Sequence, residues 1–203
     1  MKQNYQLILD KIINTECADG RHPSLLLHAC CAPCSSYVLE YLSKYFDITL
    51  FFYNPNISPE EEYRFREAEL ARLVGEMGLS EEIKIVCGKY EPERFWELSR
   101  GLENLPEGGA RCAKCYDLRL SETASHALRH GYDFFTTTLS ISPYKNAEWL
   151  NEIGEAKARE YGVRYLTSDF KKRNGYKRSC ELSQIYGLYR QDYCGCEFSK
   201  RNK

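Results

Sequence analysis

The amino-acid sequence predicts an α/β fold with an open, mainly parallel sheet of five strands and helices on both faces. Short apolar runs typical of strands alternate along the chain with longer stretches typical of helices, the pattern of parallel strands joined by crossover helices. The chain has 203 residues, which suits one domain. We therefore expect a single α/β domain over residues 1–203, without an interdomain linker.

The individual elements follow from this alternation in chain order. Strands are expected at the short apolar runs 24–29 (SLLLHA), 48–54 (ITLFFYN), 83–87 (IKIVC), 133–138 (DFFTTT) and 163–167 (VRYLT). Helices are expected before, between and after them, at 3–14, 35–45, 59–78, 92–102, 112–130, 146–161 and 180–188. The helix at 59–78 has the clearest bounds, because Pro59 suits a first turn, glutamates follow it and Gly78 lies just past the end.

Composition excludes several classes of protein. Lys and Arg number 28 against 29 Asp and Glu, so the formal net charge is -1 and no global basic field marks a histone-like protein or a binder of anionic membranes. No apolar run approaches the ~18 residues that a membrane-spanning helix needs. Residues 1–20 carry charges in an amphipathic pattern, unlike a signal peptide. We therefore expect a cytoplasmic protein that does not act in a membrane.

Ten cysteines are the unusual feature of the composition. In a reducing compartment, clustered thiols more often hold metal or do redox chemistry than form structural bridges. Three pairs of cysteines are close enough in sequence to act together: Cys30-Cys31, Cys112-x-x-Cys115 and Cys194-Gly-Cys196. Cys17, Cys87 and Cys180 lack such spacing and are expected to pack as small apolar residues.

Two of the motif-bearing loops are expected at one edge of the sheet. HACCAPCSS follows the first expected strand, and TTTLSISPYKN follows the fourth. Ligands of open α/β sheets bind at the carboxyl ends of the strands. DYCGCEFS lies on the C-terminal tail, which must fold back to reach that edge.

The first cysteines favour a metal site. The peptide that joins Cys30 and Cys31 holds their Cα atoms about 3.8 Å apart, which is too close for a relaxed disulfide. A CxxC pair such as that of Cys112 and Cys115 lets two sulfurs converge on one metal. Cys34 completes a second CxxC pair, so zinc is one interpretation, with the ligands Cys31, Cys34, Cys112 and Cys115. A [4Fe-4S] cluster that uses Cys30 and Cys31 is the other, and spacing alone leaves both open.

The tail cysteines suit redox chemistry. A disulfide between Cys194 and Cys196 closes a very small ring, so it is strained and more oxidising than a structural bridge. Gly195 between them relieves part of the backbone strain. Two further metal ligands are the alternative that this spacing leaves open.

Five motifs occur in order along nearly the whole chain: LLLHACCAPCSS, FFYNPNISPEEEYRFR, RCAKCYDLRL, FFTTTLSISPYKN and YCGCEFS. Together they closely resemble the cobalamin-independent epoxyqueuosine reductase family. Members of that family reduce the epoxide of epoxyqueuosine to an alkene at the wobble position of tRNA, the last step of queuosine biosynthesis. The resemblance implies a fold like that of the adenine-nucleotide α-hydrolases, with CCAPCSS in place of their nucleotide loop, and no use of ATP.

The resemblance also implies roles for individual residues. The implied ligands of a [4Fe-4S] cluster are Cys30, Cys31, Cys112 and Cys115. The implied redox-active disulfide joins Cys194 and Cys196. A second, mononuclear iron has been associated with the family, and it would give Cys34 or Asp117 a role as a ligand.

Reduction of an epoxide to an alkene takes two electrons and two protons, and the oxygen leaves as water, so the site needs an electron source and an acid. We expect the tail dithiol to supply the electrons and an exterior reductant, which the sequence does not identify, to restore it. The candidate acids are Asp117, Tyr116 and His28. Asp117 follows Cys115 by two positions, although a carboxylate on a helix face is the alternative, and a histidine ending a buried strand is more often a core residue.

A tRNA enzyme with little net charge needs its basic residues in one place. Residues 164–203 hold ten Lys and Arg and four acids, a net charge of +6 that leaves -7 for 1–163. Within the C-terminal segment 170–203, the expected contacts to the anticodon loop are Lys171, Lys172, Arg173, Lys177 and Arg178. Phe170 and Tyr176 lie among them, and aromatic rings stack on splayed bases.

Two functions of other classes stay open from the residues alone. One is a nucleic-acid-binding protein without catalysis, stapled by a zinc ion with four cysteine ligands, in which all three cysteine units are structural. The other is a thiol oxidoreductase that acts on proteins through the tail dithiol. An iron–sulfur protein is brown and zinc is colourless, so colour separates the first alternative from the reductase.

Overall fold

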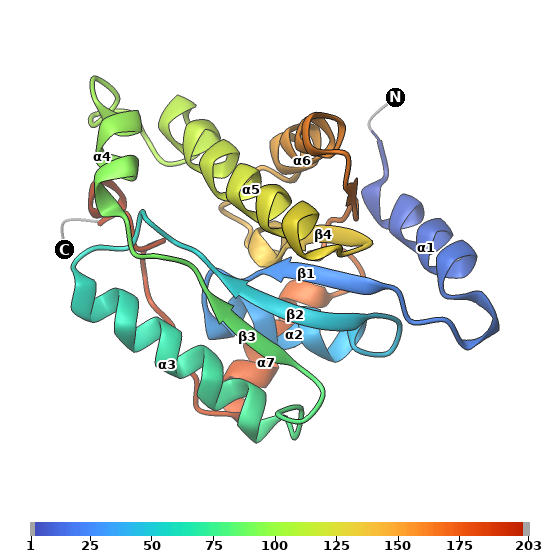
Figure 1. Ribbon diagram of the computed structural model, residues 1–203. Coiled ribbons are helices and arrows are strands. Elements are labelled where there is room, and N and C mark those ends of the chain that lie inside the picture. The colour runs from blue at the N-terminus through green and yellow to red at the C-terminus, as the bar shows by residue number, and fades with distance from the viewer. Residues whose placement is uncertain (1–2, 201–203) are drawn as a thin grey trace.

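A parallel sheet forms the centre of the molecule in a computed structural model that describes residues 3–200. Residues 1–2 and 201–203, the ends of the expected domain and of its C-terminal segment, lie outside the described residues. The five strands stand in the order β3-β2-β1-β4-β5, and all neighbouring pairs are parallel (Figure 1). The strands are β1 (Ser24–His28), β2 (Asp47–Phe52), β3 (Lys84–Cys87), β4 (Phe134–Thr137) and β5 (Arg164–Tyr165). The expected α/β fold class is therefore confirmed.

The helices follow the expected sequence of elements. They are α1 (Tyr5–Glu16), α2 (Ala32–Leu42), α3 (Glu60–Glu76), α4 (Pro92–Ser99), α5 (Ala110–His130), α6 (Ala147–Tyr161) and α7 (Gly175–Ile185). Two begin three or more residues earlier than expected. Pro33, which suits a first turn, starts α2 three residues early. Gly175 starts α7 five residues early, and glycine is a poor helix former, but a Cβ there would collide with the carbonyl oxygen of Phe170.

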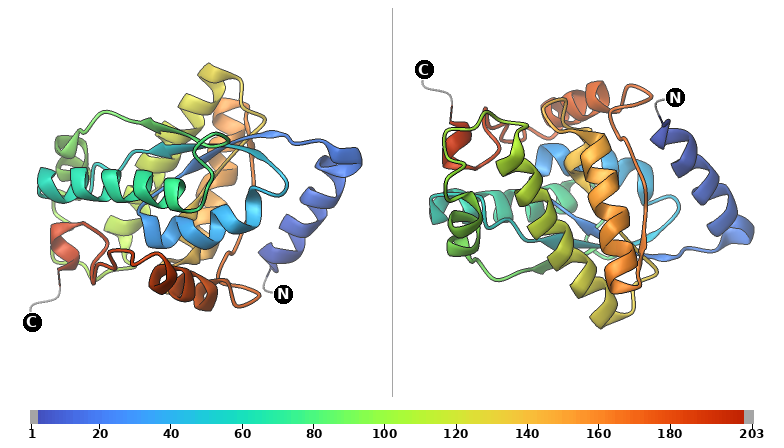
Figure 2. Two further views of the ribbon diagram at one scale, coloured as in Figure 1. Left: turned by 90° about the horizontal axis from the view of Figure 1, so that it is seen from below. Right: turned by 90° about the horizontal axis from the view of Figure 1, so that it is seen from above.

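Helices cover both faces of the sheet, with α2, α3 and α7 on one side and α5 and α6 on the other (Figures 1 and 2). Side chains of a strand alternate between faces, so Leu25 and Leu27 of β1 join the core with α2 and α3, whereas Leu26 joins the core with α5. All three side chains are fully buried. The strand is therefore covered on both faces, as parallel sheets require. No helix of residues 3–200 is both long and apolar enough to cross a bilayer.

The strand order creates a switch point between β1 and β4. The chain runs from β1 outward to β2 and β3, and then crosses back to β4 and β5 on the other side. The loops that leave the carboxyl ends of β1 and β4 therefore diverge, which is where open α/β sheets bind ligands. They meet where the amide of Cys30 donates to Thr138 Oγ1 at 3.3 Å.

Candidate functional site

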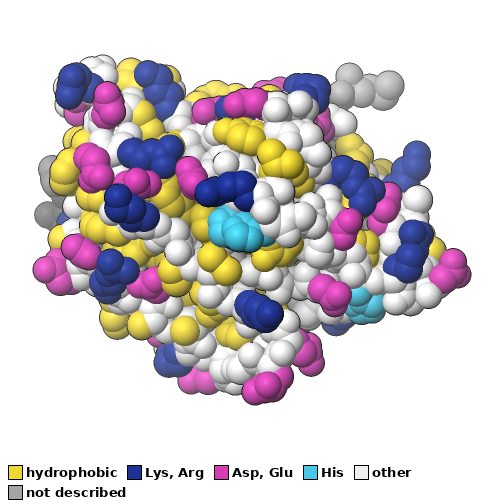
Figure 3. All heavy atoms as spheres, viewed as in Figure 1, with side chains coloured by type: hydrophobic (Ala, Val, Ile, Leu, Met, Phe, Trp, Pro, Cys, Tyr) yellow, Lys and Arg dark blue, Asp and Glu magenta, His cyan; other side chains and the backbone are white. Residues whose placement is uncertain are grey.

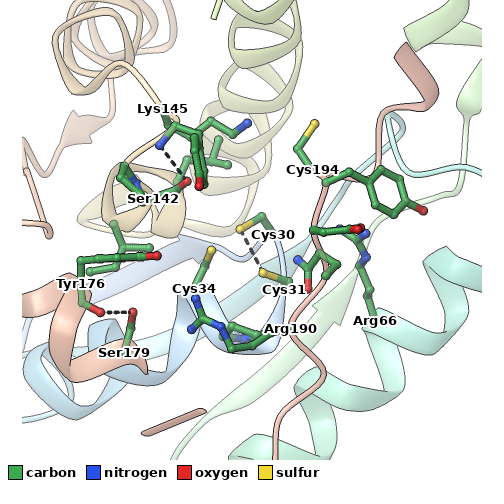
Figure 4. Close-up of a pocket in the computed structure, with 18 of the residues that line it drawn as sticks. Cys30, Cys31, Cys34, Arg66, Ser142, Lys145, Tyr176, Ser179, Arg190 and Cys194 are labelled. Carbon is green, nitrogen blue, oxygen red and sulfur yellow. Dashed lines mark hydrogen bonds between the residues drawn. The ribbon is translucent and has the colours of Figure 1, made fainter. Parts of the chain in front are cut away.

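Three cysteine sulfurs converge beyond the end of β1. The Sγ atoms of Cys30, Cys31 and Cys34 all lie within 4.8 Å of one another, and they form the one group of three or more potential metal ligands among residues 3–200. Cys31 caps the N-terminus of α2 and Cys34 lies in its first turn, so the two face the same way. Figure 4 shows the three sulfurs beside one another. We refer to these residues as the α2 thiol group.

The environment of the α2 thiol group favours the thiolate form of Cys30. Hydrogen bonds from Cys31 and Cys34, together with the charge of Arg119, hold the pKa of Cys30 well below its ordinary value. The pKa values of Cys31 and Cys34 are raised because each thiol donates to Cys30. The positive end of the α2 dipole acts in the same direction as Arg119. Thiolates are the form of cysteine that binds metal, so this donor set fits a metal or cluster.

A cavity of about 280 Å³ lies over the α2 thiol group. Its other walls are residues of the loop after β4, Tyr176 and Ser179 of α7, Arg66 of α3, and residues 190–194 of the tail (Figure 4). Such a volume is near the lower end of small-molecule sites. It can hold one small ligand or one base.

The second pair of expected ligands lies in an adjoining, smaller cavity. Cys112 and Cys115 are buried in the first turns of α5 and line this cavity together with Cys194 and Cys196. The two cavities share three wall residues: Arg119, Lys145 and Cys194. The structure thus divides the four cysteines expected around one cluster between neighbouring cavities, and it adds Cys34 to the first pair.

The tail folds back on this edge of the sheet, as expected (Figures 1 and 2). The amide of Ser58 donates to the carbonyl of Gly195 at 3.1 Å, and Asn56 Nδ2 donates to the carbonyl of Cys194 at 3.3 Å. Gly195 has φ +97°, and a Cβ there would lie 2.7 Å from Cγ1 of Ile57. Because only glycine combines this φ with so close an approach, the middle residue of the CxC unit is fixed by the docking of the tail.

The two tail thiols differ in acidity. A hydrogen bond from Cys196, the charge of Lys145 and the hydroxyl of Ser199, whose oxygen is 3.1 Å from the Cys194 sulfur, hold the pKa of Cys194 well below its ordinary value. The pKa of Cys196 is raised because its thiol donates to Cys194. All ten cysteines are free thiols. A thiolate beside a thiol is the reduced form of a redox pair.

Comparison with known proteins identifies the family. A family model described as epoxyqueuosine reductase QueH matches residues 25–202. The chain belongs to the epoxyqueuosine reductase QueH family. The QueH protein of Staphylococcus epidermidis is 45% identical over 202 residues, covering 98% of this chain and 85% of its own length. Those of Streptococcus pyogenes and Thermotoga maritima are 41% and 35% identical, over 98% and 87% of this chain and 79% and 90% of their own lengths.

The structure separates the three candidate acids of this QueH family member. Oδ1 of Asp117 lies 3.1 Å from Nζ of Lys157, and the carboxylate side chain is 53% exposed. Asp117 lines a separate hollow and neither cysteine cavity. His28 is fully buried, with Nδ1 2.8 Å from Thr137 Oγ1, and burial lowers its pKa to about 3, so it is a neutral core residue. Tyr116 alone of the three lines a cysteine cavity.

Three of the five basic residues expected to contact tRNA are engaged within the protein. Their ion pairs are Lys171 with Asp169 at 3.0 Å, Arg173 with Asp10 at 2.6 Å, and Arg178 with Glu40 at 2.6 Å. Lys172 and Lys177 form no ion pair with any described residue. On the face seen in Figure 3, basic and acidic side chains are interspersed rather than gathered by sign.

The two aromatic residues of the basic segment have different environments. Phe170 is buried in the core with β1 and α2, so the expectation that it stacks on bases is wrong. Removing its apolar ring from water into the core lowers the free energy of the folded protein. Tyr176 is 36% exposed and lines the larger cavity (Figure 4), which keeps it as a stacking candidate.

Three buried cations at the larger cavity were not expected from the sequence. The side chains of Arg66 and Lys145 are only 2% and 7% exposed, and Arg119 is buried as well. Arg119 Nη2 donates to Asn54 Oδ1, and its Nε donates to His28 Nε2 at 3.3 Å. Each of these cations lies within one of the five motifs. That position is the feature of the sequence that could have indicated a place at the site.

Proposed function

We propose that the protein reduces the epoxide of epoxyqueuosine in tRNA to the alkene, which completes queuosine. Membership of the epoxyqueuosine reductase QueH family carries this proposal, since the matched relatives bear that activity in their names. The cavity supports it, because about 280 Å³ bounded by Tyr176 and cationic side chains suits one base turned out of a tRNA loop. A tRNA substrate places the reaction in the cytoplasm.

A [4Fe-4S] cluster is the cofactor that this function calls for. Clusters are held by cysteine thiolates, and free thiols line both cavities. The residues that would hold it are Cys30, Cys31, Cys112 and Cys115. Cys34, whose sulfur lies with Cys30 and Cys31, is the better placed of the two candidate ligands for a second, mononuclear iron. When bound, the cluster supplies single electrons.

The tail dithiol supplies the two electrons of each turnover. Overall, the epoxide and the dithiol of Cys194 and Cys196 give the alkene, a disulfide and water, which balances atoms and electrons. An exterior reductant then restores the dithiol, so an electron donor is a required partner. The reduced pair is suited to donating electrons, because Cys196 and Lys145 stabilise the thiolate form of Cys194.

The test is a single turnover under anaerobic conditions. Reconstituted protein is mixed with epoxyqueuosine-containing tRNA, the nucleosides are analysed by mass spectrometry, and the tail thiols are counted by alkylation. We expect one queuosine for each disulfide formed. Stoichiometric zinc with no labile sulfide after reconstitution, and no queuosine, would instead support the zinc-stapled nucleic-acid-binding protein. Turnover of protein disulfides without cluster or RNA would support the thiol oxidoreductase.

The basic segment is the proposed contact to the anticodon loop. Lys172 and Lys177 are the members without an ion pair, and Lys177 directly follows Tyr176 at the cavity. Reversing both charges, Lys172→Glu with Lys177→Glu, should weaken tRNA binding and reduce the slope of log affinity against log salt by about 2, because each phosphate contact contributes about 1. The matched control reverses exposed Lys84 and Arg159. Unchanged affinity and slope in the first variant would reject this contact.

A further inference from the structure

Lys145 is a buried cation to which no part in the reaction has been assigned beyond stabilising the Cys194 thiolate. It lies in the loop after β4, and its Nζ lies 2.6 Å from Oε1 of Glu107. It lines both cysteine cavities, as Cys194 does. Burying an ammonium group costs free energy. The ion pair with Glu107, whose side chain is partly exposed, offsets only part of that cost. A buried charge at a cavity wall is therefore a candidate for function.

The surroundings keep Lys145 protonated. Burial alone would lower its pKa, but the charges of the Cys194 thiolate and the Glu107 carboxylate raise it above the ordinary value. The larger of these two effects, that of Cys194, ends when its sulfur enters a disulfide, so Lys145 becomes a stronger acid as the dithiol is oxidised. Figure 4 shows Lys145 and Cys194 along one side of the cavity, with the sulfurs of the α2 thiol group on the opposite side. A ligand between these sides meets one ammonium group and one redox-active sulfur on the same wall.

We propose that Lys145 is the catalytic acid, which gives a proton to the oxygen as the epoxide opens. This inference rests on the proposed function and deepens it, because it assigns the proton donor. Glu107 acts as a positioning residue that fixes the ammonium group at the wall. Its loop is anchored by Arg111, whose Nη1 donates to the carbonyls of Leu102, Glu103 and Leu105 at 2.7–2.8 Å.

The step balances with groups that this chain supplies. The thiolate of Cys194 and the thiol of Cys196 lose two electrons and form an S–S bond. Both C–O bonds of the epoxide break, and a C=C bond forms. The oxygen takes one proton from Lys145 and one from Cys196 and leaves as water. Lys145, left as a neutral amine, regains its proton from solvent.

The residues expected from the sequence are less suited to this role. Asp117 lies outside both cavities. His28 is held neutral by burial and has no place in either cavity wall. Tyr116 lines only the smaller cavity, whereas Lys145 lines both, so only Lys145 also faces the larger cavity that suits the base.

Two substitutions separate proton donation from charge. Lys145→Met removes both, whereas Lys145→Arg keeps the charge on a group that does not release its proton. We expect the single-turnover rate to fall by about 100-fold or more in both variants, since general acids contribute 10² to 10⁴, with tRNA affinity and iron content retained. The matched control is Lys157→Met, which removes a partly buried lysine paired with Asp117 and Glu160 and should react at the native rate.

Retention of the native rate by Lys145→Arg would overturn the proposal, because charge alone would then suffice. If wild-type protein forms queuosine and Lys145→Met does so equally fast, this inference fails and the proposed function stands. If wild-type protein with its full cofactor forms none, the proposed function itself fails.

A second measurement needs neither substrate nor cofactor. Iodoacetamide labels thiolates, so Lys145→Met should slow the labelling of Cys194 several-fold at pH 7, whereas Lys157→Met should not. Equal labelling of Cys194 in wild type, Lys145→Met and Lys157→Met would show that the ammonium group of Lys145 does not affect Cys194. It would overturn the proposal, which depends on the two side chains lying along the same cavity wall. Circular dichroism of each variant establishes that it is folded.

Discussion

The two cysteine-bearing helix starts at the sheet edge are assembled in different ways. The α2 thiol group comes from one continuous stretch, residues 30–34, which follows directly from β1. The start of α5 instead meets the tail: Cys115 and Cys196 pack together with Phe95 of α4. Local backbone geometry fixes the first arrangement, and tertiary docking fixes the second. The second should therefore respond to changes that leave the first intact.

The largest effect should come from breaking the local arrangement. Cys31→Ser removes a proposed cluster ligand, but serine is a good N-cap and preserves the start of α2. We expect loss of about four irons and four sulfides per chain after anaerobic reconstitution, and loss of epoxide reduction. The control is Cys87→Ser, which alters an exposed thiol on β3. A full complement of iron and sulfide in Cys31→Ser would remove Cys31 from the ligand set.

An intermediate effect should come from the docked tail. Gly195→Ala adds a methyl group that would lie 2.7 Å from Ile57 Cγ1 at φ +97°. Strain of 1–3 kcal/mol is typical of such positions, so we expect about a tenfold fall in reductase rate with iron content unchanged, and faster proteolysis of the tail. Gly187→Ala is the matched control, because Gly187 also has positive φ, +55°, but has open space around it. Equal behaviour of the two variants would show that docking at Gly195 does not matter.

The smallest effect should come from Asp117→Asn. The carboxylate belongs to α5 but is half exposed and paired with Lys157, and exposed ion pairs contribute about 0–1 kcal/mol. We expect a single-turnover rate within about twofold of wild type. A loss of 100-fold would restore Asp117 as the acid and remove Lys145 from that role.

The sequence predicted the elements that depend on local pattern. The strands fall within two residues of their expected bounds, because each is a short apolar run, and the motif loops after β1 and β4 meet at Cys30 and Thr138. The grouping of Cys34 with Cys30 was not expected, because α2 was placed three residues late. A start at Ala32 puts Cys34 in the first turn.

Features that depend on distant contacts could not be predicted in this way. The ion pair of Arg173 with Asp10 joins opposite ends of the chain, so a count of basic residues overstates the charge available to tRNA. Lys145 appears as an ordinary lysine in its motif until the fold buries it beside Glu107. Phe170 likewise belongs to a basic stretch in sequence and to the core in space.

A ribosome makes the tail that closes the site after it has made the other walls of the site. Strands β1 and β4 and the start of α5 precede it in synthesis, and chains begin to fold from their N-terminal parts. Cys30, Cys31, Cys112 and Cys115 can thus be in place while the wall formed by residues 190–194 is still being synthesised. We expect an interval in the synthesis of each molecule when these four proposed cluster ligands are accessible from outside and the dithiol does not yet face them.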